Sequence, residues 1–144
     1  MSAEFVDTNV VLYSLSDDAT KRRQTLAILV DQPVLSLQVL NKAANVMRRK
    51  LGFAIPAIRE VVLRWMRESR LHPLAPSTLL SALDVAARYG FSHYDSLIIA
   101  AALEAGCPTL YSEDLQHGQV IDQRLTIINP FKSEPRLTRG GGDG

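Results

Sequence analysis

Short apolar runs alternate along this chain with longer segments in which apolar residues recur every three or four positions. The short runs predict strands and the longer segments predict helices. Strands separated by helices are typical of a mainly parallel sheet that helices cover on both faces. We therefore predict an α/β fold, a three-layer sandwich with a central, mainly parallel sheet. The expected strands are 4–6, 33–36, 108–112 and 125–128, and the expected helices are 18–30, 37–51, 56–70, 77–89 and 93–105.

One domain accounts for most of the 144 residues. It is expected to span residues 1–131, and the glycine-rich tail 132–144 is expected to be disordered. The longest purely apolar stretch, 97–103, is far shorter than the roughly 18 residues of a membrane span. The N-terminus does not resemble a signal peptide, and the single cysteine, Cys107, has no partner for a disulfide. These features favour a cytoplasmic protein with no membrane association.

The net charge is only +1, so binding to nucleic acid would depend on local basic patches. Each patch has two interpretations: a contact with a nucleic-acid backbone, or a solvated helix face with favourable charge near a helix C-terminus. The candidates are Lys21-Arg22-Arg23, Arg48-Arg49-Lys50, and the series Arg64, Arg67 and Arg70.

Three aspartates follow predicted strands or begin a predicted helix. Asp7 comes directly after 4–6, Asp114 follows 108–112, and Asp95 lies in the first turn of the helix after Ser92. Each alone is explained as a helix cap or a turn residue. Together they are expected at the edge of the sheet where parallel strands end, which is where ligands bind in such folds. Gathered carboxylates can hold a hard divalent cation, and such a cation can promote cleavage of a phosphodiester.

Four segments, in this order, resemble a PIN domain, specifically a VapC-type toxin of a toxin–antitoxin pair. They are Phe5-Val6-Asp7-Thr8-Asn9-Val10, Ser36-Leu37-Gln38-Val39-Leu40-Asn41, the stretch 93–102, and Tyr111-Ser112-Glu113-Asp114-Leu115. The resemblance covers the chain up to about residue 130 and implies a PIN-like fold.

The resemblance also implies an activity and a site. It implies an endoribonuclease that depends on Mg²⁺ or Mn²⁺ and inhibits translation by cleaving RNA. Asp7, Asp95 and Asp114 match the catalytic and metal-binding positions, with Asn9 and Ser112 as hydrogen-bonding support. The implied partners are a VapB-type antitoxin, an RNA substrate such as a transfer RNA, and a second copy of the chain in a homodimer.

One position departs from the family pattern. The helix after the second strand usually has a glutamate in a stretch like Leu-Asn-Glu, and this chain has Leu40-Asn41-Lys42. Three carboxylates and one ammonium total −2, where four carboxylates would total −4. We expect Lys42 to act as a counter-ion among the aspartates, weakening metal binding and cleavage. The alternative is that Lys42 extends into solvent and leaves three working aspartates.

Other functions remain open at this point. A PIN-like module could bind an antitoxin or RNA without cleaving it, and the apolar helix face with Ile58 and Trp65 could serve a partner or the core. A phosphatase is weaker, because the Asp7-Thr8-Asn9 segment lacks a second aspartate. His117 could lie near the site or in a surface loop, and no nucleotide-binding glycine motif is present.

Overall fold

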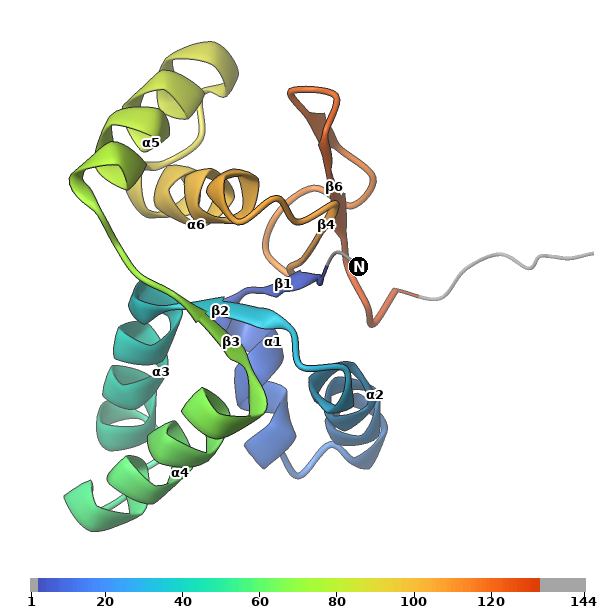
Figure 1. Cartoon of the computed structure of the whole chain (residues 1–144). Coiled ribbons are helices and arrows are strands. Elements are labelled where there is room, and N and C mark those ends of the chain that lie inside the picture. The colour runs from blue at the N-terminus through green and yellow to red at the C-terminus, as the bar shows by residue number, and fades with distance from the viewer. Residues whose placement is uncertain (1–2, 133–144) are drawn as a thin grey trace, which may run out of the picture.

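The computed structural model describes residues 3–132 and confirms the α/β sandwich (Figure 1). Its sheet has the strand order β3-β2-β1-β4-β6-β5. All neighbouring strands are parallel except β5, which runs antiparallel to β6. The strands are β1 (Phe5–Val6), β2 (Val34–Ser36), β3 (Arg70–His72), β4 (Thr109–Tyr111), β5 (Val120–Ile121) and β6 (Leu125–Ile128).

Helices cover both faces of the sheet. The helices α1 to α4 lie on one side, and α5 and α6 lie on the other (Figure 1). A single 3-10 turn, Tyr13–Leu15, follows the first helix. The helices are α1 (Thr8–Leu12), α2 (Ala19–Val30), α3 (Leu37–Arg49), α4 (Ile55–Glu68), α5 (Pro76–Tyr89) and α6 (His93–Glu104).

Side-chain caps fix the starts of several helices. Asp18 accepts a hydrogen bond from the Lys21 N–H at the start of α2, and Ser36 accepts one from Val39 at the start of α3. Gly90 ends α5, where it adopts φ +76°, a backbone conformation that suits glycine.

Two strands were not predicted. The helix expected over 56–70 ends at Glu68, and Arg70–His72 instead forms β3, which pairs with β2. This edge strand is mostly exposed and has no alternating apolar pattern, so only its backbone pairing defines it. The second missed strand, β5, is only two residues long, and a short turn connects it to β6.

The core lies between the sheet and its helices. Phe5, Leu35 and Leu110 of the central strands and Ile99 of α6 are fully buried. The apolar face of α4 belongs largely to this core: Ile58 and Trp65 are buried, and Val61 and Val62 lie against them partly buried. Of the two interpretations of this face, the structure therefore favours packing over a partner surface.

Two further expectations concern the ends of the chain and membranes. Of the tail 132–144, only Lys132 is described, so the expected disorder falls outside the described residues. Among residues 3–132, no helix is both long and apolar enough to cross a membrane.

A pair of valine substitutions tests the placement of the core. Val39 of α3 is fully buried, whereas Val30 at the end of α2 is 78% exposed. Val39→Ala should lower the free energy of unfolding by about 2–3 kcal/mol, because it removes buried methyl groups and leaves a cavity. Val30→Ala, the same change on another helix, should alter it by less than about 0.5 kcal/mol. Urea denaturation measures both, and equal effects would contradict this packing.

Candidate functional site

Asp7 lies where β1 ends and α1 begins, and it is only 8% exposed. Its extended backbone makes it the N-cap of α1, and its Oδ1 accepts a hydrogen bond of 2.7 Å from the Thr8 N–H. Its Oδ2 accepts a hydrogen bond of 3.0 Å from the hydroxyl of Ser112. Ser112 follows β4, so this bond joins the carboxyl ends of two neighbouring strands.

The surroundings of Asp7 oppose its ionisation. Burial raises the pKa of Asp7 above its ordinary value. Hydrogen bonds from Thr8 and Ser112 and the positive charge of Lys42 act in the other direction, and the Asp114 carboxylate raises the pKa further. Burial outweighs the lowering effects, so the folded protein binds a proton on Asp7 more tightly than an unfolded chain would.

Asp114 lies on the exposed loop after β4, and Asn9 of α1 donates a hydrogen bond to its Oδ2. Because Asn9 is the second residue of the helix that Asp7 caps, this bond holds the Asp114 loop beside the end of β1. We call Asp7, Asn9, Ser112 and Asp114 the Asp7 cluster. These four predicted residues are thus neighbours.

Lys42 lies on the exposed face of α3 and lowers the pKa of Asp7 through its charge. No salt bridge within 4.0 Å joins Lys42 to a carboxylate among residues 3–132. The expected counter-ion is therefore near Asp7 but not in direct contact with it, and its side chain also reaches solvent. The effect of Lys42 on metal binding stays a prediction.

Asp95 is half-buried in the first turn of α6, where its N–H donates to the Ser92 hydroxyl at 3.2 Å. This confirms the predicted cap. The start of α6 lies beside the start of α3, because the Gln38 side-chain amide donates to the Tyr94 carbonyl at 3.3 Å. The charged groups that shift the pKa of Asp7 are Lys42 and Asp114. The place of Asp95 in the metal site stays a prediction.

The geometry does not form the expected three-aspartate metal centre. In the described part of the chain, no group of three or more His, Cys, Asp or Glu side chains lies close enough to hold a metal ion. A hard cation requires several oxygen ligands at about 2.0–2.6 Å. The Asp7 cluster thus brings two of the three predicted carboxylates together, and the metal site stays a prediction.

A second group of side chains fixes the loop that bears Asp114. Glu113 accepts hydrogen bonds of 2.7 Å from both the Tyr13 hydroxyl and the Lys21 ammonium. Lys21 also lies 4.5 Å from the ring centre of Tyr13 and 5.1 Å from that of Phe131. Burial opposes ionisation of Glu113, but the bonds from Lys21 and Tyr13 outweigh it and lower its pKa. We call Tyr13, Lys21, Glu113 and Phe131 the loop clamp.

The loop clamp was missed by sequence reasoning, because Lys21 and Glu113 are 92 positions apart. The sequence makes Lys21 a candidate for contact with a nucleic-acid backbone, but in the structure its charge pairs with Glu113. Arg22 of the same patch donates to the Ser16 carbonyl at 2.7 Å. Arg48, Arg49 and Lys50 are exposed at the end of α3, where they suit the helix C-terminus.

His117 belongs to the packing of a loop. Its Nδ1 accepts a hydrogen bond of 2.9 Å from the Asn129 N–H, which ties the segment after Asp114 to the end of β6. This supports the loop interpretation of His117.

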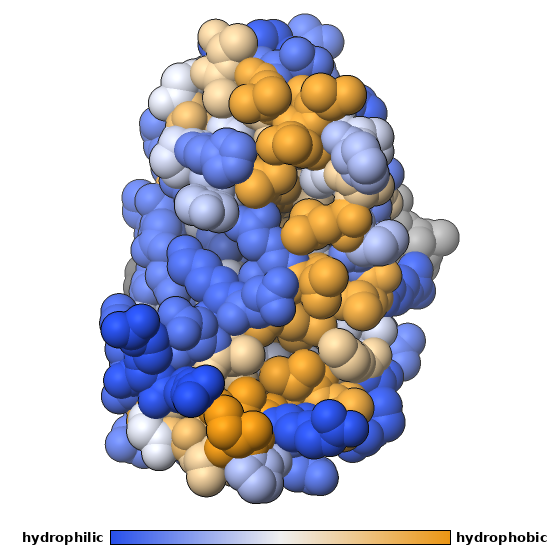
Figure 2. Space-filling view, turned by 90° about the vertical axis from the view of Figure 1, so that its left-hand side faces the viewer, coloured by the Kyte–Doolittle hydropathy of each residue, from blue (hydrophilic) through white to orange (hydrophobic). Residues whose placement is uncertain are grey.

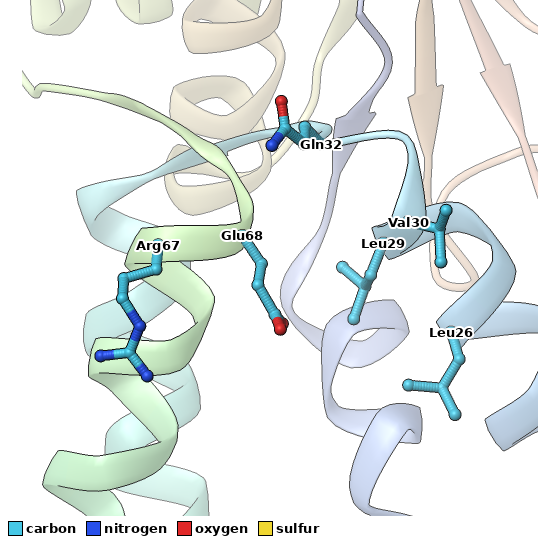
Figure 3. A pocket seen from close by; sticks show the side chains of 6 residues that line it. All are labelled: Leu26, Leu29, Val30, Gln32, Arg67 and Glu68. Atoms are coloured by element: carbon cyan, nitrogen blue, oxygen red, sulfur yellow. The ribbon is translucent and has the colours of Figure 1, made fainter.

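A hollow of about 340 Å³ lies between α2 and α4 (Figure 3). Leu26 and Leu29 face Glu68 across it, and Gln32 lies at its upper edge in this view. Gln32 precedes β2 and Glu68 precedes β3, so the hollow lies at the amino ends of these strands. The Asp7 cluster lies at the carboxyl ends, on the opposite edge of the sheet.

The family model of the PIN domain matches residues 5–121. The chain belongs to the PIN domain family. The match extends from β1 to β5 and therefore includes the whole Asp7 cluster, Lys42 and Asp95. PIN domains are typically nucleases and generally use divalent metal ions.

Solved structures share this PIN fold. VapC20 of Mycobacterium tuberculosis, described as a sarcin–ricin loop cleaving toxin, is 18% identical, with a TM-score of 0.63 over 78% of this chain and 90% of that one. A toxin–antitoxin complex from Klebsiella pneumoniae is 14% identical, with a TM-score of 0.70 over 92% and 100%. FitAcB from Neisseria gonorrhoeae is 14% identical, with a TM-score of 0.62 over 88% and 97%. Comparison with curated protein sequences gave no significant match.

The raised pKa of Asp7 predicts how stability depends on pH. The folded-state pKa lies above the unfolded value of about 3.9, so ionisation of Asp7 destabilises the fold. This destabilisation is complete above the folded pKa and disappears as the pH falls below the unfolded pKa. Asp7→Asn, which keeps an acceptor for the Thr8 N–H, should therefore be more stable than the parent at pH 7 and equally stable below about pH 4.

Urea denaturation across this pH range measures the difference. Asp17→Asn, the same change on an exposed residue, is the control. A variant Asp7→Asn that is less stable than the parent at pH 7 would show that Lys42, Thr8 and Ser112 outweigh burial.

Proposed function

We propose that this PIN domain is a toxin-type endoribonuclease whose cleavage of RNA is strongly reduced by Lys42. The observation that carries the proposal is that the charge of Lys42 acts on Asp7. The resemblance to VapC-type toxins supports it, because such toxins usually have a glutamate at the position that Lys42 occupies here. The proposed site residues are Asp7, Asp95 and Asp114, supported by Asn9 and Ser112. The proposed ion is Mg²⁺ or Mn²⁺, which these carboxylates would hold and which would polarise the phosphodiester and lower the pKa of an attacking water.

The net charge of the site determines how strongly it can bind a divalent cation. A divalent ion gains from several nearby carboxylates, whereas an ammonium in the same region already offsets part of their charge. The resident lysine also leaves the site one oxygen ligand short. Both effects weaken metal binding, and each is removed by restoring glutamate at position 42.

RNA of the translation machinery is the proposed substrate, and the cytoplasm is the proposed place of action. The description of VapC20 as a toxin that cleaves the sarcin–ricin loop supports an RNA substrate. The resemblance of the sequence to VapC-type toxins favours structured RNA such as transfer RNA. Cleavage of either kind of RNA would inhibit translation.

An antitoxin and a second copy of the chain are the proposed protein partners. Two of the neighbours in structure are a toxin–antitoxin complex and FitAB bound to a DNA fragment. A band of hydrophobic side chains runs along the face formed by α5, α3 and α4 (Figure 2). Exposed leucines of α5 include Leu79, Leu80 and Leu83. Such a surface favours a protein interface over a fully solvated one.

The second candidate is a PIN module that binds RNA or an antitoxin without cleaving RNA. It is favoured by one observation, that residues 3–132 contain no assembled group of metal ligands. The two candidates differ in what substitution of Lys42 does. A latent nuclease gains activity when the acidic residue is restored, and a binding module does not.

Lys42→Glu should bind Mn²⁺ in calorimetry and cleave a fluorescent single-stranded RNA pool at least about a hundredfold faster than the parent chain. Chelator should abolish this cleavage. Lys50→Glu is the matched control, because it makes the same charge change at the C-cap of the same helix, about 12 Å further along. It should leave both properties as they are in the parent. Adding Asp7→Asn to Lys42→Glu should remove the gain.

Two results would count against the nuclease. If Lys42→Glu binds no Mn²⁺ and cleaves no RNA, the binding module becomes the better account. If the parent chain cleaves RNA as fast as Lys42→Glu, then Lys42 does not restrain the site.

A further inference from the structure

A cavity of about 510 Å³ lies beside the Asp7 cluster, between the starts of α3 and α6. Its volume is within the range of roughly 300–1,000 Å³ that is typical of ligand pockets. We call it the Tyr94 cavity. It is lined by Gln38, Asn41 and Lys42 of α3, by Leu74 of the connection before α5, and by Tyr94 and Leu97 of α6.

We propose that the Tyr94 cavity holds one unstacked nucleobase of a single-stranded RNA. The inference rests on the proposed function, because it places an RNA strand at the Asp7 cluster. It goes further by assigning the residues that recognise a base, none of which belongs to the proposed catalytic group.

The walls of the cavity suit the flat face of a base. Leu74 and Leu97 are apolar, and Tyr94 is 65% exposed at the start of α6. An exposed aromatic ring next to a cavity provides a surface on which a base can stack, and RNA recognition commonly uses such rings. The His93 ring lies 5.2 Å from that of Tyr94 at an interplanar angle of 80°, and this edge contact restricts how Tyr94 turns.

The polar side of the cavity has unused hydrogen-bonding capacity. The Gln38 nitrogen donates to the Tyr94 carbonyl, and this bond identifies the other terminal atom as the oxygen. That oxygen is buried, and in the described part of the chain no donor reaches it. The bond that holds the amide is 3.3 Å long, above the usual length of about 2.9–3.0 Å for an N–H···O bond, so the amide is held weakly. Asn41 adds an exposed amide to the same wall.

Charge favours RNA over an apolar peptide as the occupant. Lys42 lines the cavity and also acts on Asp7, so one side chain borders both the cavity and the Asp7 cluster. A nucleotide with its base in the cavity has its phosphate within reach of an ammonium group, which is how lysine commonly binds nucleic-acid backbones. A peptide side chain would use the leucines but would leave this charge and the Gln38 oxygen without partners.

Fluorescence anisotropy of the full chain in chelator tests the proposal. The two probes are a short single-stranded RNA and the same RNA with one abasic position in its centre. The parent chain should bind the complete RNA about tenfold more tightly than the abasic one, because stacking of one base has an effect of this size. Tyr94→Ala should bind both probes equally, whereas Tyr94→Phe, which keeps the ring, should retain the preference.

A third variant separates stacking from recognition of base edges. Gln38→Leu keeps the volume of the wall and removes its amide, so it should bind with unchanged strength overall but lose any preference among adenine, cytosine, guanine and uracil homopolymers. Thermal unfolding shows whether each variant remains folded. Because Tyr94 is mostly exposed, neither substitution there should lower the melting temperature appreciably.

The outcomes distinguish this inference from the proposed function. Equal affinity of the parent for both probes, or an undiminished preference in Tyr94→Ala, would overturn the nucleobase assignment and leave the cavity to an apolar peptide side chain. That result would stand even if Lys42→Glu cleaves RNA. A preference that depends on Tyr94 would support the assignment even if Lys42→Glu cleaves nothing, and the nuclease proposal alone would then fail.

Discussion

The parallel pairing of β1 with β4 is the constraint on which the site depends. Phe5 lies opposite Leu110 and Val6 opposite Tyr111, and the Asp7 N–H continues the ladder by donating to the Tyr111 carbonyl at 2.9 Å. This register places Asp7 beside Ser112. A slip of one residue would turn the buried side chains of β1 to the opposite face and separate the two. The hydrophobic core of the central strands thus fixes the position of a polar site at their ends.

A carboxylate buried at such a point must be compensated, and three agents can do this: a proton, a metal ion or a basic side chain. Hydrogen bonds from Thr8 and Ser112 supply part of the compensation, and the charge of Lys42 supplies another part at longer range. Burial nevertheless raises the pKa of Asp7. The charge of Lys42 therefore offsets only part of the cost of burying this carboxylate, and this imbalance underlies the proposal of a restrained enzyme.

Helix α3 connects the candidate functions of the molecule. Its Ser36 cap fixes its start at the end of β2, and the next turns present Gln38, Asn41 and Lys42 toward the start of α6. On the other side of the cluster, the loop clamp holds Glu113, the neighbour of Asp114, against Tyr13 and Lys21. The Asp7 cluster is therefore bounded by a well-anchored loop and by a cavity whose wall includes a lightly held amide.

The strands β1, β2, β4 and β6, most helix boundaries and the family could be predicted from the sequence, because these depend on local apolar patterns, caps and short motifs. It also placed Asp7 and Asp114 at one edge, because parallel strands end on the same side of a sheet. Tertiary structure alone decided β3 and β5, whose residues have no strand pattern and are defined by pairing. It also decided that Lys21 meets Glu113, that Gln38 meets Tyr94, and that Lys42 stops short of a salt bridge. Those contacts join residues far apart in the chain, and only the packing of helices on the sheet sets the distances between them.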